Sequence, residues 1–511
     1  MNTLRTAVRT AISEAESNGI MYQISQKYGV VGDTDSYKLS HICQYINGAD
    51  MMTSYIESRG GLHDKVVWYG LQLIIKEYLL QRLTHEQVDN MIEWIKGHMM
   101  ATEDTPWLIS LETAFRTVVD EYDGYMPVRI SAAPEGLVIP VKNVLAVIET
   151  TVPDARIFSL VSYIETRVLG VWSPTTVATI SYHLRQEIYK RLVETADDAD
   201  AEIAFKLHDF GSRGTTSQTQ AAFAGSGHLV SFMGTDTTVA IMAAELAYNC
   251  PMAGFSIIAS EHSTTTTHGR YGEEGFISNV FDNAAKPGAI FATVADSYDV
   301  ISFIRNIVPK FKDRLIESEA TWVIRPDSCD PIKMPIQCLI ELEKVMGCTI
   351  NSKGYKVLNN VRVIQGDGIT PKDVVKILDA AIALGYSATN LAFGMGGGLL
   401  QKNDRDTQKF SMKCSAVRVN GEWMDVYKNP AVYDDNWNLI EDEISFKKSK
   451  KGRLELLQYD DEQSGVDYKT VRATEVDQFP GWKPMLEPVW DTGNLLRDMT
   501  FDEVRSNAGT F

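Results

Sequence analysis

The sequence has little of three features that mark large classes of protein: positive charge, long apolar runs and closely spaced cysteines. Its formal net charge is −18 over 511 residues, which argues against the broad basic face of a nucleic-acid-binding protein. Apolar runs nowhere approach the roughly 20 residues that a membrane-spanning helix needs. The six cysteines are scattered, with neither a CxxC pair nor the spacing of metal ligands. We therefore expect buried thiols in a reducing cytosol, and hence a cytoplasmic protein.

Two stretches carry local charge patterns of their own. The N-terminal stretch MNTLRTAVRTAISEAESNG lacks the apolar centre of a secretory signal, and its Glu14 and Glu16 are untypical of an organelle transit peptide. We expect an ordinary helical extension over residues 1–30. Basic residues gather in FKKSKKGR at 446–453, which composition alone assigns to a solvated loop.

The middle of the chain repeats one rhythm, a short apolar run that ends in polar residues or glycine and leads into a helix-patterned segment. Helical patterns occupy 299–315 and 370–385, the second with a Thr N-cap, an early Pro and a closing Gly. Strands that alternate with helices indicate parallel pairing. Periodicity alone is compatible with a closed barrel or with an open doubly wound sheet. The expected strands lie within 202–214, 228–236, 255–263, 289–299, 320–328, 361–368 and 390–398.

The two ends of the chain have a different pattern. Residues 126–150 alternate between apolar and polar positions and contain turn residues, as antiparallel strands do. Residues 411–429 predict a hairpin that turns at Asn420 and Gly421. We expect one α+β domain built from both ends of the chain, with an α/β domain inserted between them. The predicted boundaries are 1–150 with 411–511 for the first domain and 151–410 for the second.

Polar and charged residues gather at the carboxyl ends of the expected strands, the edge where parallel α/β folds bind ligands. The run LAFGMGGGLLQK at 391–402 places Gly396 and Gly397 where bare main chain can receive a phosphate. Arg405 and Lys413 follow soon afterwards and can pair with phosphate oxygens.

Acidic residues accompany this loop. IRPDS supplies Arg325 and Asp327, QGDG supplies Asp367, and DSYD supplies Asp296. Such acids can hold ribose hydroxyls or a hydrated Mg²⁺ ion, which together favour a sugar phosphate, although ion pairs that fix helix ends are the alternative. His262 in SEHSTTTTHG lies in line with these strand-end groups.

The ordered motifs TDSYKLSH, KLHDFGSRG, GTDT, EHST, DSYD, IRPDS, RVIQGDG and AFGMGGGLLQK resemble those of the nicotinamide phosphoribosyltransferase family. NSKGYKVL, KKSKKGR and FDEVRSNA extend the resemblance, which covers roughly residues 30–511. It implies a type II phosphoribosyltransferase with an irregular α/β barrel joined to an α+β domain, and a homodimer with active sites at the interface. The implied reaction moves the 5-phosphoribosyl group from phosphoribosyl pyrophosphate to nicotinamide, which gives nicotinamide mononucleotide and pyrophosphate in NAD salvage.

The resemblance also implies a role for each site residue. His262 would be the histidine that ATP phosphorylates, with Asp296 close by, and Mg²⁺ would bind at Asp296 and Asp327. The nicotinamide ring and its carboxamide would be held by Phe210, Arg213, Asp236 and Arg325, with Asp35 and Tyr37 from the partner subunit. The ribose would be bound by Asp327, Gly366 and Asp367. The phosphate groups would be bound by Gly396, Gly397, Arg59, Arg405, Ser411, Lys413, Lys428 and Lys447.

Asp236 bears on the choice between two related substrates. A carboxylate can accept a hydrogen bond from the amide NH₂ of nicotinamide but repels the carboxylate of nicotinate. We therefore expect the amide substrate. Nicotinate phosphoribosyltransfer, and a non-catalytic ligand-binding relative, are the alternatives.

Overall fold

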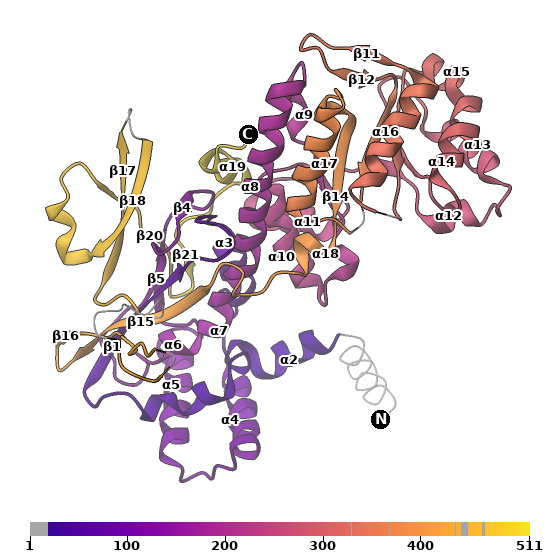
Figure 1. The fold of residues 1–511 in the computed structure, drawn as a ribbon. Coiled ribbons are helices and arrows are strands. Elements are labelled where there is room, and N and C mark those ends of the chain that lie inside the picture. Colours follow the sequence, from indigo (N-terminus) through magenta and orange to yellow (C-terminus); the bar gives the residue numbers. More distant parts are fainter. Residues whose placement is uncertain (1–18, 329, 367, 435, 441–447, 462–464) are drawn as a thin grey trace, which may run out of the picture. The chain divides into compact units, whose positions relative to one another are not determined.

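The computed structural model describes residues 19–328, 330–366, 368–434, 436–440, 448–461 and 465–511. Contacts between Cα atoms divide the chain into two units (Figure 1). Unit 1 comprises the residues up to Trp172 together with Gln408–Met499, and unit 2 comprises Ser173–Thr407 together with Thr500–Phe511. Within the described residues, no helix is both long enough and apolar enough to cross a membrane.

Unit 1 is built on an antiparallel sheet to which both ends of the chain contribute. The central pair joins β1 to β15, more than three hundred residues later in the sequence, with Tyr55 opposite Lys413 and Glu57 opposite Ser411. In spatial order the strands are β16 (Glu422–Asp425), β15 (Phe410–Val419), β1 (Ala49–Ser58), β5 (Val144–Thr150), β3 (Val128–Ala132), β20 (Glu487–Asp491) and β21 (Asn494–Leu495). This mixed origin confirms an α+β unit made from both chain ends.

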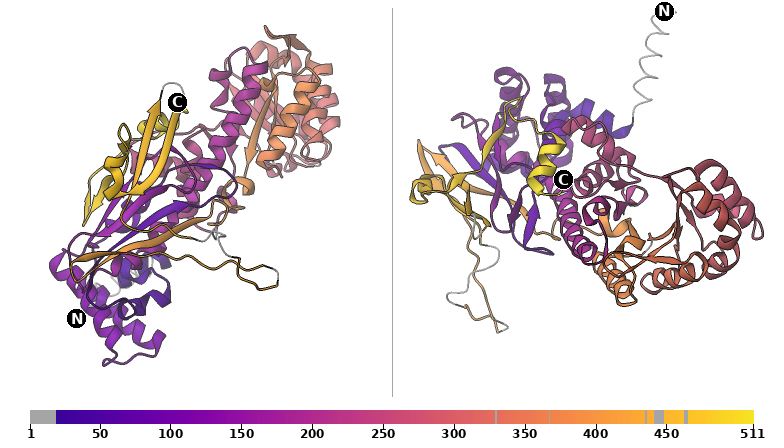
Figure 2. Two further views of the ribbon diagram at one scale, coloured as in Figure 1. Left: turned by 60° about the vertical axis from the view of Figure 1, so that its left-hand side comes forward. Right: turned by 90° about the horizontal axis from the view of Figure 1, so that it is seen from above.

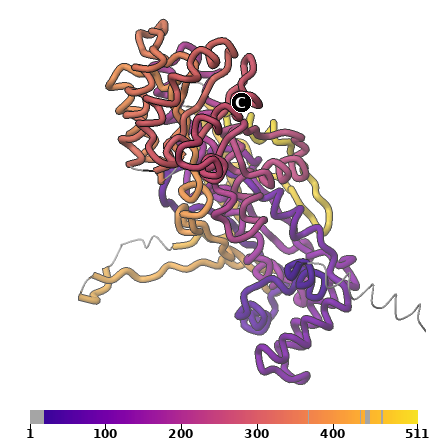
Figure 3. The backbone as a smooth tube through the Cα atoms, turned by 90° about the vertical axis from the view of Figure 1, so that its right-hand side faces the viewer, coloured from indigo at the N-terminus to yellow at the C-terminus, as the bar shows by residue number. Residues whose placement is uncertain are grey.

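The hairpin β15–β16 turns where the sequence predicts. Asn420 and Gly421 have φ values of 51° and 88°, the left-handed conformation that a two-residue hairpin turn requires. After β16 the chain leaves the sheet as an extended arm, which Figure 3 shows as a tube.

Smaller sheets and short helices complete unit 1. The smaller sheets pair β2 (Lys65–Val67) with β4 (Val138–Pro140), and β17 (Leu454–Asp461) with β18 (Gly465–Arg472) and β19 (Lys483–Pro484). The helices are α2 (Ile20–Tyr28), η1 (Gly29–Gly32), η2 (Ser36–Cys43), α3 (Leu71–Ile74), η3 (Ile75–Leu79), α4 (His85–Met99), α5 (Pro106–Glu121), α6 (Leu160–Tyr163), α7 (Glu165–Val168), η4 (Leu169–Val171) and η8 (Ala473–Gln478). Residues 1–18, most of the predicted helical extension, lie outside the described residues.

Unit 2 is built on a curled parallel sheet of seven strands. In spatial order the strands are β7 (Gly234–Thr235), β6 (Leu207–Asp209), β14 (Leu391–Met395), β13 (Val361–Gln365), β10 (Thr321–Arg325), β9 (Ile290–Val294) and β8 (Ile258–Ala259). The first and last of these strands in the sequence, β6 and β14, pair inside the sheet, so that its two edges are β7 and β8. A parallel bridge between Gly234 and Phe255 spans the remaining gap beside β8. This arrangement confirms the irregular parallel α/β barrel.

Helices cover the outer face of the curled sheet, as the right-hand view in Figure 2 shows. The helices of unit 2 are α8 (Trp172–Thr195), α9 (Ala199–Ile203), η5 (Ser212–Gly214), α10 (Gln218–Leu229), α11 (Thr238–Tyr248), α12 (His262–Thr266), α13 (Glu273–Ala284), α14 (Val300–Ser302), η6 (Phe303–Ile307), α15 (Val308–Ser318), α16 (Lys333–Met346), α17 (Pro371–Ala383), η7 (Ala388–Asn390), α18 (Gly397–Leu400) and α19 (Phe501–Ala508). A two-stranded ribbon pairs β11 (Cys348–Ile350) with β12 (Lys356–Leu358).

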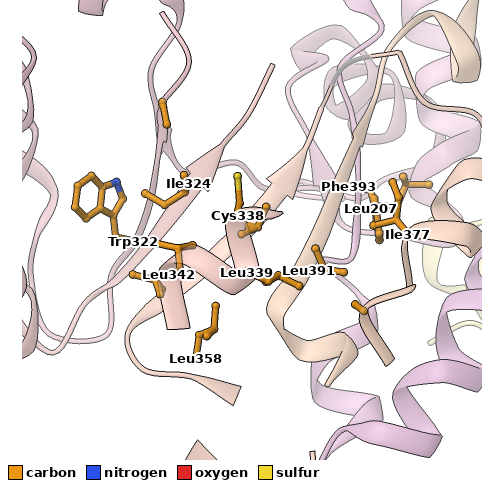
Figure 4. Close-up of a cluster of buried hydrophobic side chains, with 14 of the residues drawn as sticks. Leu207, Trp322, Ile324, Cys338, Leu339, Leu342, Leu358, Ile377, Leu391 and Phe393 are labelled. Atoms are coloured by element: carbon orange, nitrogen blue, oxygen red, sulfur yellow. The ribbon is translucent and has the colours of Figure 1, made fainter. Parts of the chain in front are cut away.

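The main core of unit 2 lies between the sheet and these helices. Trp322 and Ile324 of β10 are fully buried there, together with Leu339 of α16 and Leu391 of β14 (Figure 4). Because side chains alternate along a strand, the residues between these positions point to the opposite face of the sheet. That inner face is where the candidate site begins.

The boundaries between the two units differ from the domain boundaries that the sequence predicts. The sequence patterns place the boundaries after residues 150 and 410. In the structure, unit 1 ends at Trp172 and resumes at Gln408, and the last helix belongs to unit 2. Arg505 of α19 explains this assignment, because its guanidinium donates hydrogen bonds to the carbonyls of Leu229 and Ala253 at 2.7–3.1 Å.

None of the cysteines that the structure describes forms a disulfide. The expectation of buried thiols is nevertheless wrong for Cys43, which is exposed at the end of η2. Its thiol lies 3.1 Å from the carbonyl of Ser40 on the surface of unit 1.

Candidate active site

The carboxyl ends of the barrel strands place the predicted site residues in series around one edge of the curled sheet. Each of these residues follows its strand by a few positions at most, so the parallel pairing brings together motifs that are far apart in the sequence. The residues are Phe210 after β6, Asp236 after β7, His262 after β8, Asp296 after β9, Asp327 after β10, Gly366 after β13 and Gly396 after β14.

Four ionisable side chains at this edge form one connected group. Oδ1 of Asp327 accepts hydrogen bonds from Nε and Nη2 of Arg325 at 3.1 and 2.9 Å. Oδ2 of Asp327 lies 3.4 Å from Nε2 of His262, whose Nδ1 is 3.2 Å from Oγ of Ser297. The main-chain N–H of Asp327 donates to Oδ2 of Asp296 at 2.7 Å. These contacts orient both carboxylates, while 44% of the His262 side chain remains exposed.

Asp296 keeps one oxygen atom that no hydrogen bond satisfies. Its Oδ1 is buried without a partner among the described residues and lies 3.9 Å from Nε2 of His262. An unsatisfied buried carboxylate oxygen is costly, so this atom fits a cation or a ligand-bound water molecule. The described residues contain no group of three His, Cys, Asp or Glu side chains that could hold a metal ion. An Mg²⁺ ion here would take most of its ligands from water and a bound phosphate, as Mg²⁺ usually does.

The ring of Phe210 lies beside this charged group. The guanidinium carbon of Arg325 is 5.6 Å from the ring centroid, within the range of a cation–π contact. A methyl group added to Gly394 would come within 2.0 Å of Cε2 of Phe210, so only glycine leaves room for the ring. The ring packs against a small apolar cluster on the inner face of the sheet, formed by Ala292, Val323, Ile364 and Ala392. This platform suits a flat aromatic ligand.

The glycine loop after β14 lies against the main chain that carries Phe210. The N–H of Phe210 donates to the carbonyl of Met395 at 3.0 Å, and Nε2 of Gln401 donates to the carbonyl of Gly211 at 2.6 Å. A Cβ atom at Gly396 would lie 3.1 Å from the carbonyl oxygen of Phe210. Gly397 begins α18, where the first N–H groups have no carbonyl partner within the helix. The loop can therefore offer bare main-chain donors to a phosphate.

Asp236 contacts the carboxyl end of β6 through Asp209. The main-chain N–H of Asp236 donates to the carbonyl of Asp209 at 2.9 Å, and Oδ1 of Asp209 accepts from the N–H of Gly211 at 2.7 Å. Burial raises the pKa of Asp209 to about 6. The exposed Asp236 carboxylate accepts a hydrogen bond from Oγ of Ser256 at 2.6 Å through Oδ1. This single hydrogen bond orients a carboxylate that can still accept from a ligand.

Three predicted phosphate-binding residues lie together on unit 1. Arg59 follows β1, and the strand register places Ser411 and Lys413 of β15 opposite Glu57 and Tyr55. The N–H of Arg59 donates to the carbonyl of Lys409 at 3.2 Å, which continues this register beyond β1. Opposite and alternate residues share one face of a sheet, so these side chains point the same way. Nε of Arg59 and Oγ of Ser411 are both buried without a partner among the described residues.

The other predicted residues are placed as follows. Asp35 and Tyr37 lie at the start of η2 in unit 1, both exposed, and Asp35 accepts from Oγ1 of Thr166 at 3.0 Å. Lys428 lies beyond β16, also in unit 1. Two further predicted cations, Arg213 on η5 and Arg405 after α18, are exposed in unit 2. The predicted residues Asp367 and Lys447 lie outside the described part of the chain.

Sequence reasoning missed three residues that the geometry brings into the site. Ser256 precedes β8 in a run that reads as an apolar strand, and Gln401 follows the glycine loop without a recognisable pattern. Asp209 could have been found, because an acid inside the apolar run before Phe210 is costly unless it has a role.

The comparisons with known proteins agree with this arrangement. Residues 205–456 match the nicotinate phosphoribosyltransferase (NAPRTase) family, and residues 29–130 match the N-terminal domain of nicotinamide phosphoribosyltransferase. A curated nicotinamide phosphoribosyltransferase from Xanthomonas campestris pv. campestris is 46% identical over 478 residues, which cover 93% of this chain and 97% of the relative. Another from Acinetobacter baylyi is 29% identical and covers 92% of this chain and 95% of the relative.

Two solved structures share the fold at low sequence identity. A nicotinate-nucleotide pyrophosphorylase from Pyrococcus furiosus has a TM-score of 0.55 at 14% identity and covers 94% of this chain and 95% of its own. Human nicotinic acid phosphoribosyltransferase has a TM-score of 0.52 at 15% identity, with 93% of each chain covered. The matches name phosphoribosyltransferases and related pyridine nucleotide enzymes. With 46% identity over nearly its whole length, the chain belongs to the nicotinamide phosphoribosyltransferase family.

Proposed function

We propose that the protein transfers the 5-phosphoribosyl group of phosphoribosyl pyrophosphate to nicotinamide in NAD salvage. The products are nicotinamide mononucleotide and pyrophosphate. The observation that carries this proposal is the connected series at the strand ends of unit 2, from His262 and Asp327 through Arg325 to the ring of Phe210. It combines an aromatic platform with charged groups suited to a sugar phosphate.

In the proposed reaction, the pyridine nitrogen of nicotinamide attacks C1 of the ribose while the bond from C1 to the pyrophosphate oxygen breaks. The electron pair of that bond leaves with pyrophosphate, and positive charge develops on the ribose. The carboxylates of Asp327 and Asp296 stabilise this charge, and the cationic side chains bind the leaving group. No side-chain nucleophile is needed, because stacking on Phe210 orients the attacking nitrogen.

The preference for the amide over the acid rests on Asp236. Its carboxylate, oriented by Ser256, accepts a hydrogen bond from the carboxamide NH₂ and repels the carboxylate of nicotinate. Arg213, helped by Arg325, binds the same carboxamide.

Mg²⁺ and ATP are the proposed cofactor and co-substrate. Asp296 and Asp327 are the residues that would hold Mg²⁺, and the unsatisfied Oδ1 of Asp296 supports this assignment. The ion would neutralise the charge of the pyrophosphate group. The exposed imidazole of His262 would accept a phosphoryl group from ATP, and its added negative charge near the metal would strengthen binding of the sugar substrate.

The proposed assembly is a homodimer, and its support is the family resemblance. In it Asp35 and Tyr37 of one subunit complete the base site of the other. The phosphate groups are bound by the residues that the resemblance implies, among them Arg59, Ser411, Lys413, Lys428 and Lys447. The proposed location is the cytoplasm, which rests on the scattered cysteines of the sequence.

The test is the yield of nicotinamide mononucleotide from nicotinamide and phosphoribosyl pyrophosphate, with and without ATP. The proposal predicts mononucleotide in both reactions and a higher yield with ATP. His262→Ala should abolish both ATP hydrolysis and the stimulation by ATP. Calorimetric binding of phosphoribosyl pyrophosphate without any product would instead identify a non-catalytic relative.

A further inference from the structure

Unit 1 contains a buried carboxylate in the middle of its predicted anion-binding face. Glu57 lies on β1, and the strand register puts it on the same face as Arg59, Ser411 and Lys413. Its side chain is 3% exposed. A buried acid is costly by itself, and its negative charge opposes the binding of an anion at the neighbouring residues. Its presence there therefore needs an explanation.

The contacts of Glu57 lead to one lysine. Oε2 of Glu57 forms an ion pair with Nζ of Lys450. Oε1 accepts a hydrogen bond from the hydroxyl of Tyr55 at 3.5 Å, and that hydroxyl accepts from the main-chain N–H of Lys450 at 2.8 Å. Burial and the neighbouring Glu57 carboxylate raise the pKa of Tyr55, so its hydroxyl keeps the proton that it donates. Lys450 is thus fixed through both its side chain and its main chain.

The segment around Lys450 is hydrogen-bonded to Lys428, another of the predicted phosphate-binding cations. The N–H of Ser449 donates to the carbonyl of Lys428 at 3.1 Å, and the N–H of Lys428 donates to Oγ of Ser449 at 3.0 Å. Further along, the N–H of Gly452 donates to the carbonyl of Ser415 on β15 at 2.8 Å. Residues 448–452, called here the basic segment, therefore connect Lys428 to the face that bears Arg59 and Lys413.

We propose that Glu57 is a positioning residue for binding of the pyrophosphate group. Through Lys450 it fixes the basic segment, and with it Lys428, beside β1 and β15. Its own negative charge is neutralised by Lys450, and the arrangement leaves Arg59, Ser411 and Lys413 to meet the anion. This inference rests on the proposed function, because it assigns the basic segment to the phosphoribosyl pyrophosphate site.

The first test compares Glu57→Gln with Asp50→Asn. The control is matched, because Asp50 lies on β1 and pairs with Arg418 of β15 at 2.8 Å, at the other end of the same two strands. Glu57→Gln should raise the KM for phosphoribosyl pyrophosphate by about tenfold or more, the value of a lost charged hydrogen bond. Its kcat and its KM for nicotinamide should stay within about twofold, as expected when uniform binding is lost. Asp50→Asn should change none of the three.

A double-mutant cycle tests whether Glu57 acts through Lys450. Lys450→Met should reproduce the Glu57→Gln phenotype, Lys450→Arg should restore most of the affinity, and the double variant Glu57→Gln/Lys450→Met should be no worse than either single variant. Additive losses would overturn the proposal. So would a Glu57→Gln variant whose two KM values rise equally, since that indicates general damage to the fold.

Tyr55→Phe provides an independent variant where Glu57→Gln does not fold, because it removes only the hydroxyl that receives the N–H of Lys450. It should raise the KM for phosphoribosyl pyrophosphate selectively, by a smaller factor. An unchanged KM in Tyr55→Phe would overturn the proposal. A wild-type protein that forms no mononucleotide refutes the proposed function itself, whereas an active wild type with an unaffected Glu57→Gln refutes only the role of Glu57.

Discussion

Asp209 and Asp236 are carboxylates at the ends of neighbouring strands, and their surroundings give them different properties. Asp209 is fully buried, whereas Asp236 is exposed and oriented by Ser256. Burial disfavours the ionised form of Asp209 and raises its pKa.

The buried acid predicts a pH-dependent stability. The pKa of Asp209 is about 6 in the folded protein and near 3.8 when unfolded, so between these values only the folded state keeps the proton. The free energy of unfolding therefore falls as pH rises through this interval, by about 3 kcal/mol in all. Asp209→Asn has no carboxyl group to titrate, so its stability does not fall in this interval. The Tm of the variant minus the Tm of wild type should therefore increase as the pH is raised from about 4 to above about 6.

Asp50 provides a control, because its pKa shift, and hence the pH dependence of its contribution to stability, has the opposite sign. Its hydrogen bond with Arg418 lowers its pKa, so its contribution to stability is present at neutral pH and is lost on acidification. Asp50→Asn should therefore lose Tm relative to wild type at neutral pH and approach it in acid. A Tm difference between Asp209→Asn and wild type that is the same at both pH values would contradict the role of burial.

The exposed acid predicts substrate selection. Asp236→Asn keeps the size of the side chain and its hydrogen bond with Ser256 but removes the charge that repels nicotinate. Its KM for nicotinate should fall by about tenfold, while its KM for nicotinamide should rise. Steady-state assays with each base measure both effects. An unchanged ratio of kcat/KM for the two bases would show that another residue makes the selection.

At the scale of single residues, the sequence motifs single out most residues of the candidate site but do not predict which residues contact one another. The strand-end pattern singles out His262, Arg325 and Asp327, because charged residues after apolar runs are conspicuous in the sequence. It cannot reveal that Arg325 donates to Asp327 rather than to another acid, since two residues of separation permit several rotamers. Ser256 was missed because it lies in a run with the pattern of an apolar strand, twenty residues after its partner Asp236.

At the scale of elements, the junction of β14 with α18 depends on the size of one residue. Gly394 has no strained backbone angle, but a Cβ atom there would lie 2.0 Å from the Phe210 ring. Gly394→Ala should therefore displace the ring and raise the KM for nicotinamide by about tenfold or more, the order of one lost aromatic contact.

The matched control for this change is Gly97→Ala in α4, where a Cβ atom would meet open space and alanine favours the helix. It should leave both KM values unchanged. Binding of phosphoribosyl pyrophosphate, measured by calorimetry, should survive in Gly394→Ala, because the phosphate loop itself is not altered. A wild-type KM for nicotinamide in Gly394→Ala would mean that Phe210 does not bind the base.

Most elements could be predicted from local patterns. All seven expected runs contain a strand of the barrel, and the Asn420–Gly421 turn lies where two residues favour a left-handed backbone. The pairing of β1 with β15 could not be predicted, because strand register depends on long-range contacts. The face on which Arg59 and Lys413 lie together, the proposed anion-binding face, follows from this register.

At the scale of the whole molecule, periodicity left the choice between a closed and an open sheet undecided. In the structure the sheet curls into an irregular barrel, in which β6 pairs with β14 and a parallel bridge from Gly234 to Phe255 spans the gap between β7 and β8. The last helix joins unit 2 through Arg505, a contact between distant residues that no local pattern signals.

The proposed homodimer predicts complementation between inactive variants. Tyr37→Ala and Phe210→Ala should each lose most activity, because each removes one face of the base site. Coexpressed together, they should form mixed dimers with one intact site of two, which should have about half of the wild-type activity. Assay of the purified mixed dimer measures this. Activity no higher than that of either variant alone would place both residues in the same subunit's site.

The most direct test of the central claim is a competition between nicotinamide and nicotinate at equal concentration, with phosphoribosyl pyrophosphate, Mg²⁺ and ATP present. If the strand ends of unit 2 bind an amide-bearing ring beside a phosphoribosyl group, nicotinamide mononucleotide should dominate the products by at least about tenfold. Equal amounts of the two mononucleotides, or an excess of the nicotinate product, would contradict it.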